Sequence, residues 1–277
     1  MSRLRAAGGC FVVTSGVPAN RAAMGTVKKW LSLLLLTMAA WSLVVAATAA
    51  DRFDAALRHS GRSADDLRRD RRDHPAEILR LTGIGPGMQV ADLLGGDGYY
   101  SELASYLVQP GGGVQLINNE AYDHWSDGPR RQRLSAGRLS NVTHRIVDLN
   151  SMQLGTGTFD AIILSKVYHD LYWIDPDGQW PLIHTGAVLD RVVAALKRGG
   201  VLLLIDHSAL AGHGASDAST LHRIEEAYAR RDFETRGLAV SAHSDLLRRP
   251  DDSLDDVSYK SPRLGNTDRF VLVFRKN

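Results

Sequence analysis

Six apolar runs of strand length, separated by segments long enough for helices, constrain the fold of this chain more than any other feature. They are MQVADLL (88–94), GVQLINN (113–119), VTHRIV (142–147), FDAIILS (159–165), VLLLID (201–206) and DRFVLVFRK (268–276). The first, fourth and fifth runs are almost continuously apolar, as expected for strands that helices cover on both faces. The alternation predicts an α/β fold with a doubly wound, mostly parallel sheet.

The N-terminal 50 residues are expected to lie outside this domain. Lys28 and Lys29 precede an uncharged apolar run, residues 30–50, in which Ala47 and Ala49 are placed as in an A-x-A cleavage site. This pattern predicts a signal peptide over 24–50, cleaved before Ala50 or Asp51, and export to a bacterial periplasm. An uncleaved inner-membrane anchor over 30–50 is the alternative, because about 20 apolar residues can cross a bilayer.

Residues 1–23 are interpreted as an over-extended start or a disordered stub, because Met24 opens the better signal peptide. The only cysteine, Cys10, lies in this stretch. Of the 33 basic residues, five lie before Asp51, where there is no acidic residue, so 28 basic residues face 31 acidic ones in the remainder. A weakly acidic body without a basic stripe gives no reason to expect a nucleic-acid partner.

The predicted domain, residues 51–277, opens with a helical extension. Residues 51–74 are charged and compatible with a helix, and Pro75 begins a short helix that ends at Gly83. The arginines of this segment could bind phosphate, but the interleaved Asp66, Asp70 and Asp73 favour a solvated helix face. The arginines are Arg68, Arg69, Arg71 and Arg72.

A glycine-rich turn follows the first strand, in VADLLGGDGYYSELASYL (90–107). Asp92 lies near the end of the strand, and Gly95, Gly96 and Gly98 follow it. Glycine lets a backbone approach a ligand closely and adopt positive φ, and ligands of doubly wound sheets bind beyond the carboxyl ends of the strands. A tight turn without a ligand is the alternative. The G-x-G-x-x-G spacing of NAD-linked reductases is absent.

This segment resembles motif I of class I S-adenosylmethionine-dependent methyltransferases, acid-x-Gly-x-Gly-x-Gly. Asp92 matches the acid, Gly96 and Gly98 match the second and third glycines, Gly95 falls at a variable position, and Leu94 replaces the first glycine. FDAIILS and ALKRGGVLLLIDH resemble the family's fourth and fifth strands. HPAEIL, Tyr-His-Asp after the fourth strand and the closing DRFVLVFRK resemble a group of exported bacterial predicted methyltransferases.

The resemblance covers about residues 75–275. It implies a seven-stranded Rossmann-like sheet with S-adenosylmethionine as cofactor. The family usually has an acid after the second strand that binds the ribose hydroxyls; here Asn118 stands there, with Glu120 as a possible substitute. Asp148 matches the acid that meets the adenine amine, and a cap on the next turn is its alternative role.

Candidates for the chemistry lie in SKVYHDLYWID (165–175). His169 is a candidate base with a pKa near 6.5 if unperturbed, Asp170 could orient it or contact the cofactor's methionine amine, and Tyr168 lies beside them. Structural packing of these aromatic residues is the alternative. His207, His213 and His222 lie on other segments without the i, i+3 or i, i+4 spacing of helical ligands, so no metal site is predicted.

These observations predict a methyltransferase that acts on an unidentified small-molecule acceptor, with no nucleic-acid partner and no stable membrane partner once the signal is cleaved. Because methyl transfer from a sulfonium is a displacement, the protein has to align the acceptor and, where needed, remove its proton. The alternative is an exported, non-catalytic domain that keeps the fold and binds another ligand.

Overall fold

The computed structural model describes residues 52–260 and 264–277, which belong to one compact unit. The expected signal peptide, its cleavage site and Cys10 lie outside these residues. Within the described ranges, no helix is long and apolar enough to cross a membrane.

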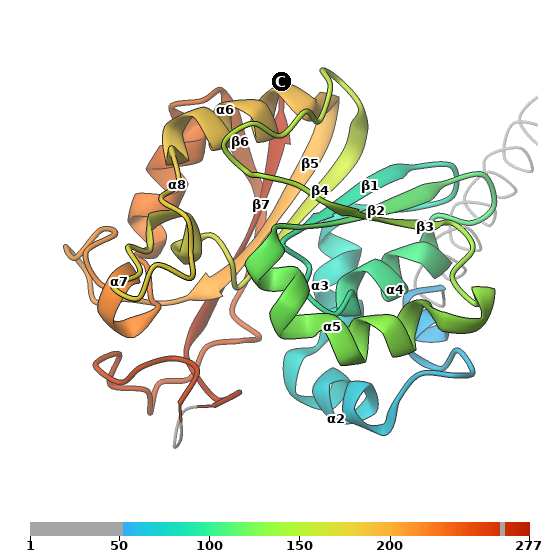
Figure 1. Cartoon of the computed structure of the whole chain (residues 1–277), viewed down its shortest axis with the longest axis horizontal. Helices are drawn as coiled ribbons and strands as arrows, with labels where there is room; N and C mark the ends of the chain where they lie inside the picture. Colours follow the sequence, from blue (N-terminus) through green and yellow to red (C-terminus); the bar gives the residue numbers. More distant parts are fainter. Residues whose placement is uncertain (1–51, 261–263) are drawn as a thin grey trace, which may run out of the picture. The chain divides into compact units, whose positions relative to one another are not determined.

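Seven strands form one sheet in the order β3-β2-β1-β4-β5-β7-β6 (Figure 1). Strands β1 to β5 pair in parallel, and β7 lies antiparallel between β5 and β6. The predicted seven-stranded, mostly parallel sheet is confirmed. The strands are β1 (Gln89–Leu93), β2 (Gly113–Asn118), β3 (Val142–Ile146), β4 (Phe159–Ser165), β5 (Leu196–His207), β6 (Leu238–Ser244) and β7 (Arg269–Lys276).

Helices connect the parallel strands and cover both faces of the sheet (Figure 1). They are α2 (Ala64–Asp73), α3 (Pro75–Thr82), α4 (Tyr99–Leu107), α5 (Glu120–Leu134), α6 (Thr185–Ala195), α7 (Ala218–Leu221) and α8 (Glu226–Glu234), with short 3-10 turns η1 (Ser135–Gly137) and η2 (His169–Tyr172). Because β1 is followed by β2 on one side and β4 lies on its other side, the chain reverses its direction of winding between β1 and β4. Ligands of such sheets bind at this position.

Two apolar cores lie on the two faces of the sheet. Successive side chains of a strand point to opposite faces, so Ala91 and Ile162 belong to one core, and Val90 and Ile163 belong to the other. Helices α6 and α8 contribute to the first core, and α3 and α4 contribute to the second. The continuous apolar runs of β1 and β4 are explained by this double burial.

Helix α2 was predicted to have a solvated charged face, but part of that face is buried. Asp66 and Asp73 are buried, and they pair with arginines from distant segments: Arg133 Nη1 lies 2.9 Å from Asp66 Oδ2, and Arg269 Nη2 lies 3.0 Å from Asp73 Oδ1. Arg69 lies over the ring of Tyr99, 3.7 Å from its centroid. The acidic residues therefore attach α2 to the domain through ion pairs, which a local charge pattern cannot reveal.

Candidate active site

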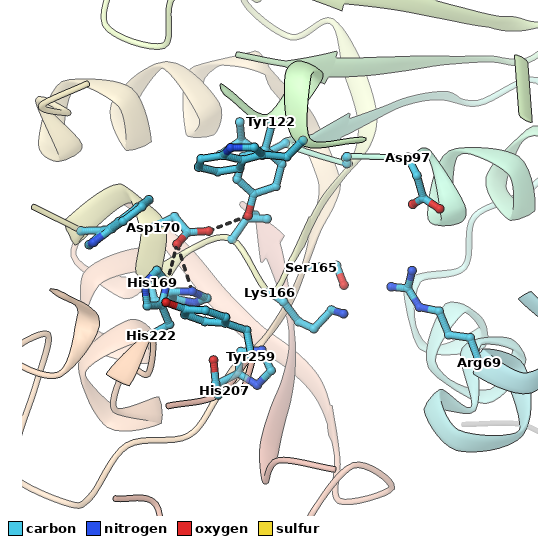
Figure 2. Close-up of a pocket in the computed structure, with 17 residues that line it drawn as sticks. Arg69, Asp97, Tyr122, Ser165, Lys166, His169, Asp170, His207, His222 and Tyr259 are labelled. Atoms are coloured by element: carbon cyan, nitrogen blue, oxygen red, sulfur yellow. Dashed lines mark hydrogen bonds and ion pairs between the residues drawn. The ribbon is translucent and has the colours of Figure 1, made fainter. Parts of the chain in front are cut away.

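A cavity of about 550 Å³ lies beyond the carboxyl ends of β1 and β4, where the strand order reverses (Figure 2). Its walls come from residues 94–97 of the glycine turn, residues 165–167, 169 and 170 at the end of β4, His207 at the end of β5 and the aromatic side chains of Tyr122, Trp125, Trp173 and Tyr259. We call it the turn cavity. Ligand-sized concave sites of this kind, with aromatic walls and polar groups at fixed positions, are typical of small-molecule binding.

The conformation and packing of the glycine turn require glycine at three positions. Gly96 and Gly98 have φ angles of 59° and 82°, which glycine adopts without strain. A Cβ on Gly95 would lie 2.5 Å from the carboxyl carbon of Asp92 and 2.7 Å from Leu116 Cδ1. The turn thus needs glycine at positions 96 and 98 for its backbone angles and at 95 for space.

Asn118 fixes the turn instead of facing the turn cavity. The Gly96 amide donates to Asn118 Oδ1 at 3.0 Å, and Asn118 Nδ2 donates to the Gly96 carbonyl at 2.9 Å. The side chain is fully buried. The side-chain amide of Asn118, which was predicted to bind the ribose hydroxyls, therefore makes its hydrogen bonds with the backbone of the turn.

Asp92 also lies beneath the turn rather than in the turn cavity. Its carboxyl is buried and accepts a hydrogen bond from Ser101 Oγ at 2.7 Å. Burial raises the pKa of Asp92 from 3.8 to about 6. Asp92, which was predicted to contact the cofactor, thus supports the glycine turn, and the turn itself would contact the cofactor.

Replacing Asp92 with asparagine should remove a pH-dependent loss of stability. The folded pKa lies above the unfolded one, so the contribution of Asp92 is complete below about pH 4 and is lost as the pH rises to about 6. Relative to the unaltered chain, Asp92→Asn should gain about 2–3 kcal/mol between pH 4 and 7. Urea unfolding at each pH measures this difference, and parallel curves for the two proteins would contradict it.

The other two cofactor candidates, Glu120 and Asp148, line a second cavity of about 410 Å³ at the ends of β2 and β3. Both side chains are exposed, and Glu120 begins α5. Asp148 also caps its own turn, since it accepts from the Asn150 amide at 2.9 Å and from Ser151 Oγ at 3.0 Å. Both roles predicted for Asp148 are compatible with this position. Neighbouring residues Ala121 and Tyr122 line the second cavity and the turn cavity respectively.

His169 lies between two carboxylates at the wall of the turn cavity. Its Nδ1 is 2.6 Å from Asp206 Oδ1, and its Nε2 is 3.1 Å from Asp170 Oδ1. Burial alone would lower the pKa of His169, but Asp170 and Asp206 raise it to about 10. The imidazole is therefore protonated at neutral pH, which does not suit the predicted role as a base with a pKa near 6.5.

Asp170 is held on every side by donors. His222 Nδ1 lies 3.2 Å from Asp170 Oδ1, and the Tyr122 hydroxyl donates to Asp170 Oδ2 at 2.5 Å. Burial would raise the pKa of Asp170, but the His169 cation holds it well below its usual range. The predicted pairing of Asp170 with His169 is present, and His222 joins them from 52 residues away in sequence.

Tyr168 points away from the turn cavity. Its hydroxyl donates to Asp232 Oδ2 of α8 at 2.6 Å, and Tyr172 donates to the same oxygen at 2.6 Å. The ring is fully buried in the core. Tyr168 thus fulfils the packing role that the sequence left open, not the catalytic one.

One end of the turn cavity is cationic, which the sequence did not predict. Figure 2 shows the half-buried Lys166 directed toward Arg69 of α2. The charge of Arg69, together with burial, lowers the pKa of Lys166 to about 7. No hydrogen bond or ion pair of the Lys166 ammonium is present among residues 52–260 and 264–277. Two cations that face one cavity beside a glycine turn are suited to an anionic group.

Backbone strain is concentrated at the same cavity. Five non-glycine residues in the described part of the chain have positive φ, and three of them line the turn cavity: Leu94 (54°), Lys166 (61°) and His222 (50°). A left-handed residue of this kind costs about 1–2 kcal/mol, and such strain clusters at functional sites. Leu94, which replaces the first glycine of motif I, therefore keeps the backbone conformation that a glycine would adopt readily.

The other two histidines named from the sequence, His207 and His213, lie in different environments. His207 lines the turn cavity, and its Nδ1 is 2.6 Å from Thr267 Oγ1. Burial and the His169 cation hold its pKa well below 6.5. His213 lies at the surface, 2.9 Å from Asp217. Arg223, the neighbour of His222 in sequence, is fully buried and does not line the turn cavity.

The chain resembles solved methyltransferases in fold. A methyltransferase dependent on S-adenosylmethionine from Aquifex aeolicus superposes with a TM-score of 0.51 and 18% identity, over 72% of this chain and 88% of that one. A putative sarcosine dimethylglycine methyltransferase from Galdieria sulphuraria gives 0.51 and 16%, over 76% and 86%. The [4+2]-cyclase SpnF gives 0.52 and 13%, over 79% and 84%.

No protein-family profile and no curated protein sequence matches the chain. At these identities the likeness concerns the fold alone, and the cyclase shows that one fold serves more than one chemistry. The chain therefore has the Rossmann-like fold of class I methyltransferases.

Proposed function

We propose that this chain is a methyltransferase that uses S-adenosylmethionine and acts on a small-molecule acceptor. One observation carries the proposal: a glycine turn of the motif I type borders an aromatic cavity where the strand order reverses. A cavity beside such a turn, at the point where the strand order reverses, supports the proposal of a donor site there. Export to a periplasm is part of the proposal and rests on the sequence of residues 24–50 alone.

In this proposal the donor lies along the sheet edge, with its methionine part in the turn cavity and its adenosine part toward the second cavity. The backbone of Gly95 and Gly96 approaches the methionine part, and Arg69 and Lys166 bind its carboxylate. Glu120 and Asp148 are the acceptors available for the ribose and the adenine amine. The donor supplies the methyl group, and the protein aligns the acceptor with it.

The acceptor would occupy the part of the turn cavity that Trp125, Trp173 and Tyr259 border. These aromatic side chains favour a flat or largely apolar acceptor. The test is transfer of a radiolabelled methyl group to a panel of phenols, amines and thiols. We expect labelling of at least one class, whereas donor binding without transfer to any of them would favour the non-catalytic domain.

Lys166→Met should weaken binding of the donor by about 10- to 100-fold, because a charge-assisted hydrogen bond is worth about 1.5–3 kcal/mol. Lys197→Met is the matched control, because Lys197 pairs with Asp160 at 2.8 Å at the opposite end of the strands. This variant should bind the donor as the unaltered chain does. Methylthioadenosine lacks the carboxylate, so it should bind equally to the unaltered chain and to Lys166→Met. An equal loss for both ligands would contradict a role of Lys166 in binding the carboxylate.

A further inference from the structure

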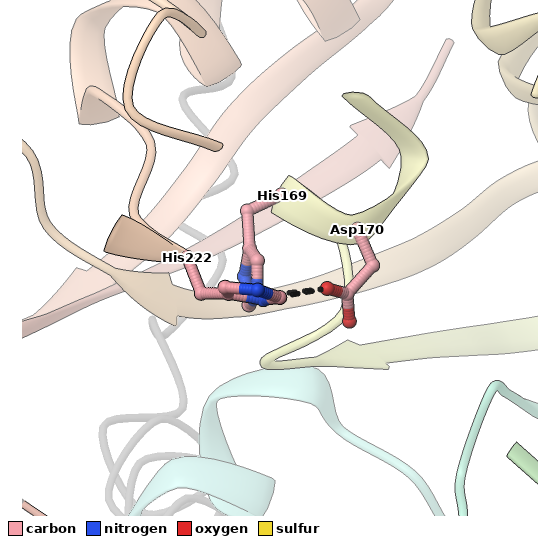
Figure 3. A group of neighbouring side chains, drawn as sticks. All are labelled: His169, Asp170 and His222. Carbon is pink, nitrogen blue, oxygen red and sulfur yellow. Dashed lines mark hydrogen bonds and ion pairs between the residues drawn. The ribbon is translucent and has the colours of Figure 1, made fainter. Parts of the chain in front are cut away.

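Two histidines and an aspartate meet at the wall of the turn cavity, away from its cationic end. Figure 3 shows the imidazoles of His169 and His222 beside the carboxylate of Asp170. One ligand atom from each residue lies within 4.8 Å of the others. All three side chains line the turn cavity, and His169 and Asp170 are otherwise buried.

We propose that His169, Asp170 and His222 bind one divalent transition-metal ion. Asp170 Oδ1 lies 3.1 Å from His169 Nε2 and 3.2 Å from His222 Nδ1. Ligands about 2.0–2.2 Å from a common ion, at angles of about 90–110°, are separated by about 3.0–3.5 Å. Both imidazole nitrogens therefore already have the separation from Asp170 Oδ1 that coordination requires, and the two nitrogens lie within 4.8 Å of each other.

Residues that hydrogen-bond to the proposed ligands are of the kind that orients ligands in metal sites. The fully buried Asp206 lies 2.6 Å from His169 Nδ1 and also accepts the amide of His169 at 2.9 Å. A carboxylate behind a ligating imidazole fixes its orientation and directs the other nitrogen to the metal. Tyr122 holds the second oxygen of Asp170 in the same way.

The ligand set indicates which ions fit. Two imidazoles and one carboxylate suit Zn²⁺, Fe²⁺, Co²⁺ or Ni²⁺ better than Mg²⁺ or Ca²⁺, which prefer oxygen ligands only. The ion would take the place of the protons that now lie between Asp170 and the two imidazoles. Since the site borders the turn cavity, one coordination position of a tetrahedral ion or three of an octahedral ion would remain for an acceptor or water, and a bound hydroxyl would lose its proton more readily.

Titration of the chelator-treated full chain, without a histidine tag, tests this proposal with Co²⁺ as the probe. We expect one ion per chain, visible absorption bands of a site with nitrogen ligands, and a dissociation constant below about 10 µM. His222→Ala should weaken binding by at least about 100-fold, and Asp206→Asn by about 10- to 100-fold. His213→Ala, which alters an exposed histidine–aspartate pair, should bind as the unaltered chain does.

An independent measurement on the unaltered chain covers the case in which a variant fails to fold. X-ray absorption of the Zn²⁺-loaded chain should show two imidazole nitrogens and a carboxylate oxygen at about 2.0–2.1 Å. Three results would each overturn the metal site: an X-ray absorption spectrum without imidazole scattering, no binding at millimolar Co²⁺, or the same Co²⁺ affinity in His222→Ala as in the unaltered chain. The assays use neither donor nor acceptor, so their outcome is independent of the proposed methyl transfer.

Discussion

Gly95→Ala should abolish binding of S-adenosylmethionine and lower the free energy of unfolding by about 1–3 kcal/mol. The added Cβ would lie 2.5 Å from both the carboxyl carbon and Oδ2 of Asp92, and 2.7 Å from Leu116 Cδ1. Asp92 and Leu116 are buried, so neither can withdraw without moving the strand ends that carry the turn. Calorimetry measures the binding, and urea unfolding measures the stability.

Gly128→Ala is the matched control on the neighbouring helix α5. An alanine Cβ at this position meets nothing within 4 Å, and its φ is not positive. Alanine is the better helix former, but Pro129 disfavours the helical conformation of a preceding residue that carries a Cβ, so this variant should change the free energy of unfolding by no more than about 1 kcal/mol and bind the donor normally. Normal donor binding by Gly95→Ala would show that the turn does not contact the ligand.

Arg223→Met should destabilise the fold by about 3–5 kcal/mol, because it removes one partner of a buried ion pair. Arg223 and Asp252 are both fully buried, with Arg223 Nη2 3.0 Å from Asp252 Oδ1. The same guanidinium donates to the carbonyls of Ser208 and Asp256 at 3.0 and 2.8 Å. It thereby joins the end of β5 to the segment that leads to Tyr259 at the turn cavity.

Arg131→Met is the control for this substitution. Arg131 also pairs with an aspartate, Asp127, at 2.7 Å, but its side chain is 73% exposed. Exposed ion pairs contribute about 0–1 kcal/mol, so this variant should unfold almost as the unaltered chain does. Equal losses for Arg223→Met and Arg131→Met would contradict the importance of burial.

The sequence predicts the sheet well because burial on both faces leaves a continuous apolar signal. Each of the six predicted runs coincides with all or part of a strand of the sheet. Strand β6, LAVSAHS, was not among them, since it lies at the edge of the sheet and its side chains alternate between more and less exposed positions. The glycine turn was also recognised, because its backbone conformation depends on residues that are adjacent in sequence.

The partners of the site residues could not be predicted in the same way. Periodicity shows which face a residue occupies, but not what approaches that face from a distant segment. His222 reaches Asp170 across 52 positions, and Arg69 reaches the turn cavity from a helix expected to be solvated. Tyr168 and Asn118 are polar residues at the expected places, yet their hydrogen bonds go to Asp232 and Gly96. Lys166 had no signal of its own beyond its position after β4.

Binding of S-adenosylmethionine at the glycine turn is the central claim, and isothermal titration of the full chain tests it most directly. We expect saturable binding of one donor per chain, similar binding of its demethylated product, and loss of both in Gly96→Val. Gly96 has a φ of 59°, which a β-branched residue adopts only with strain, and it borders the turn cavity. No binding of either ligand to the unaltered chain, or unchanged binding by a folded Gly96→Val, would contradict the account.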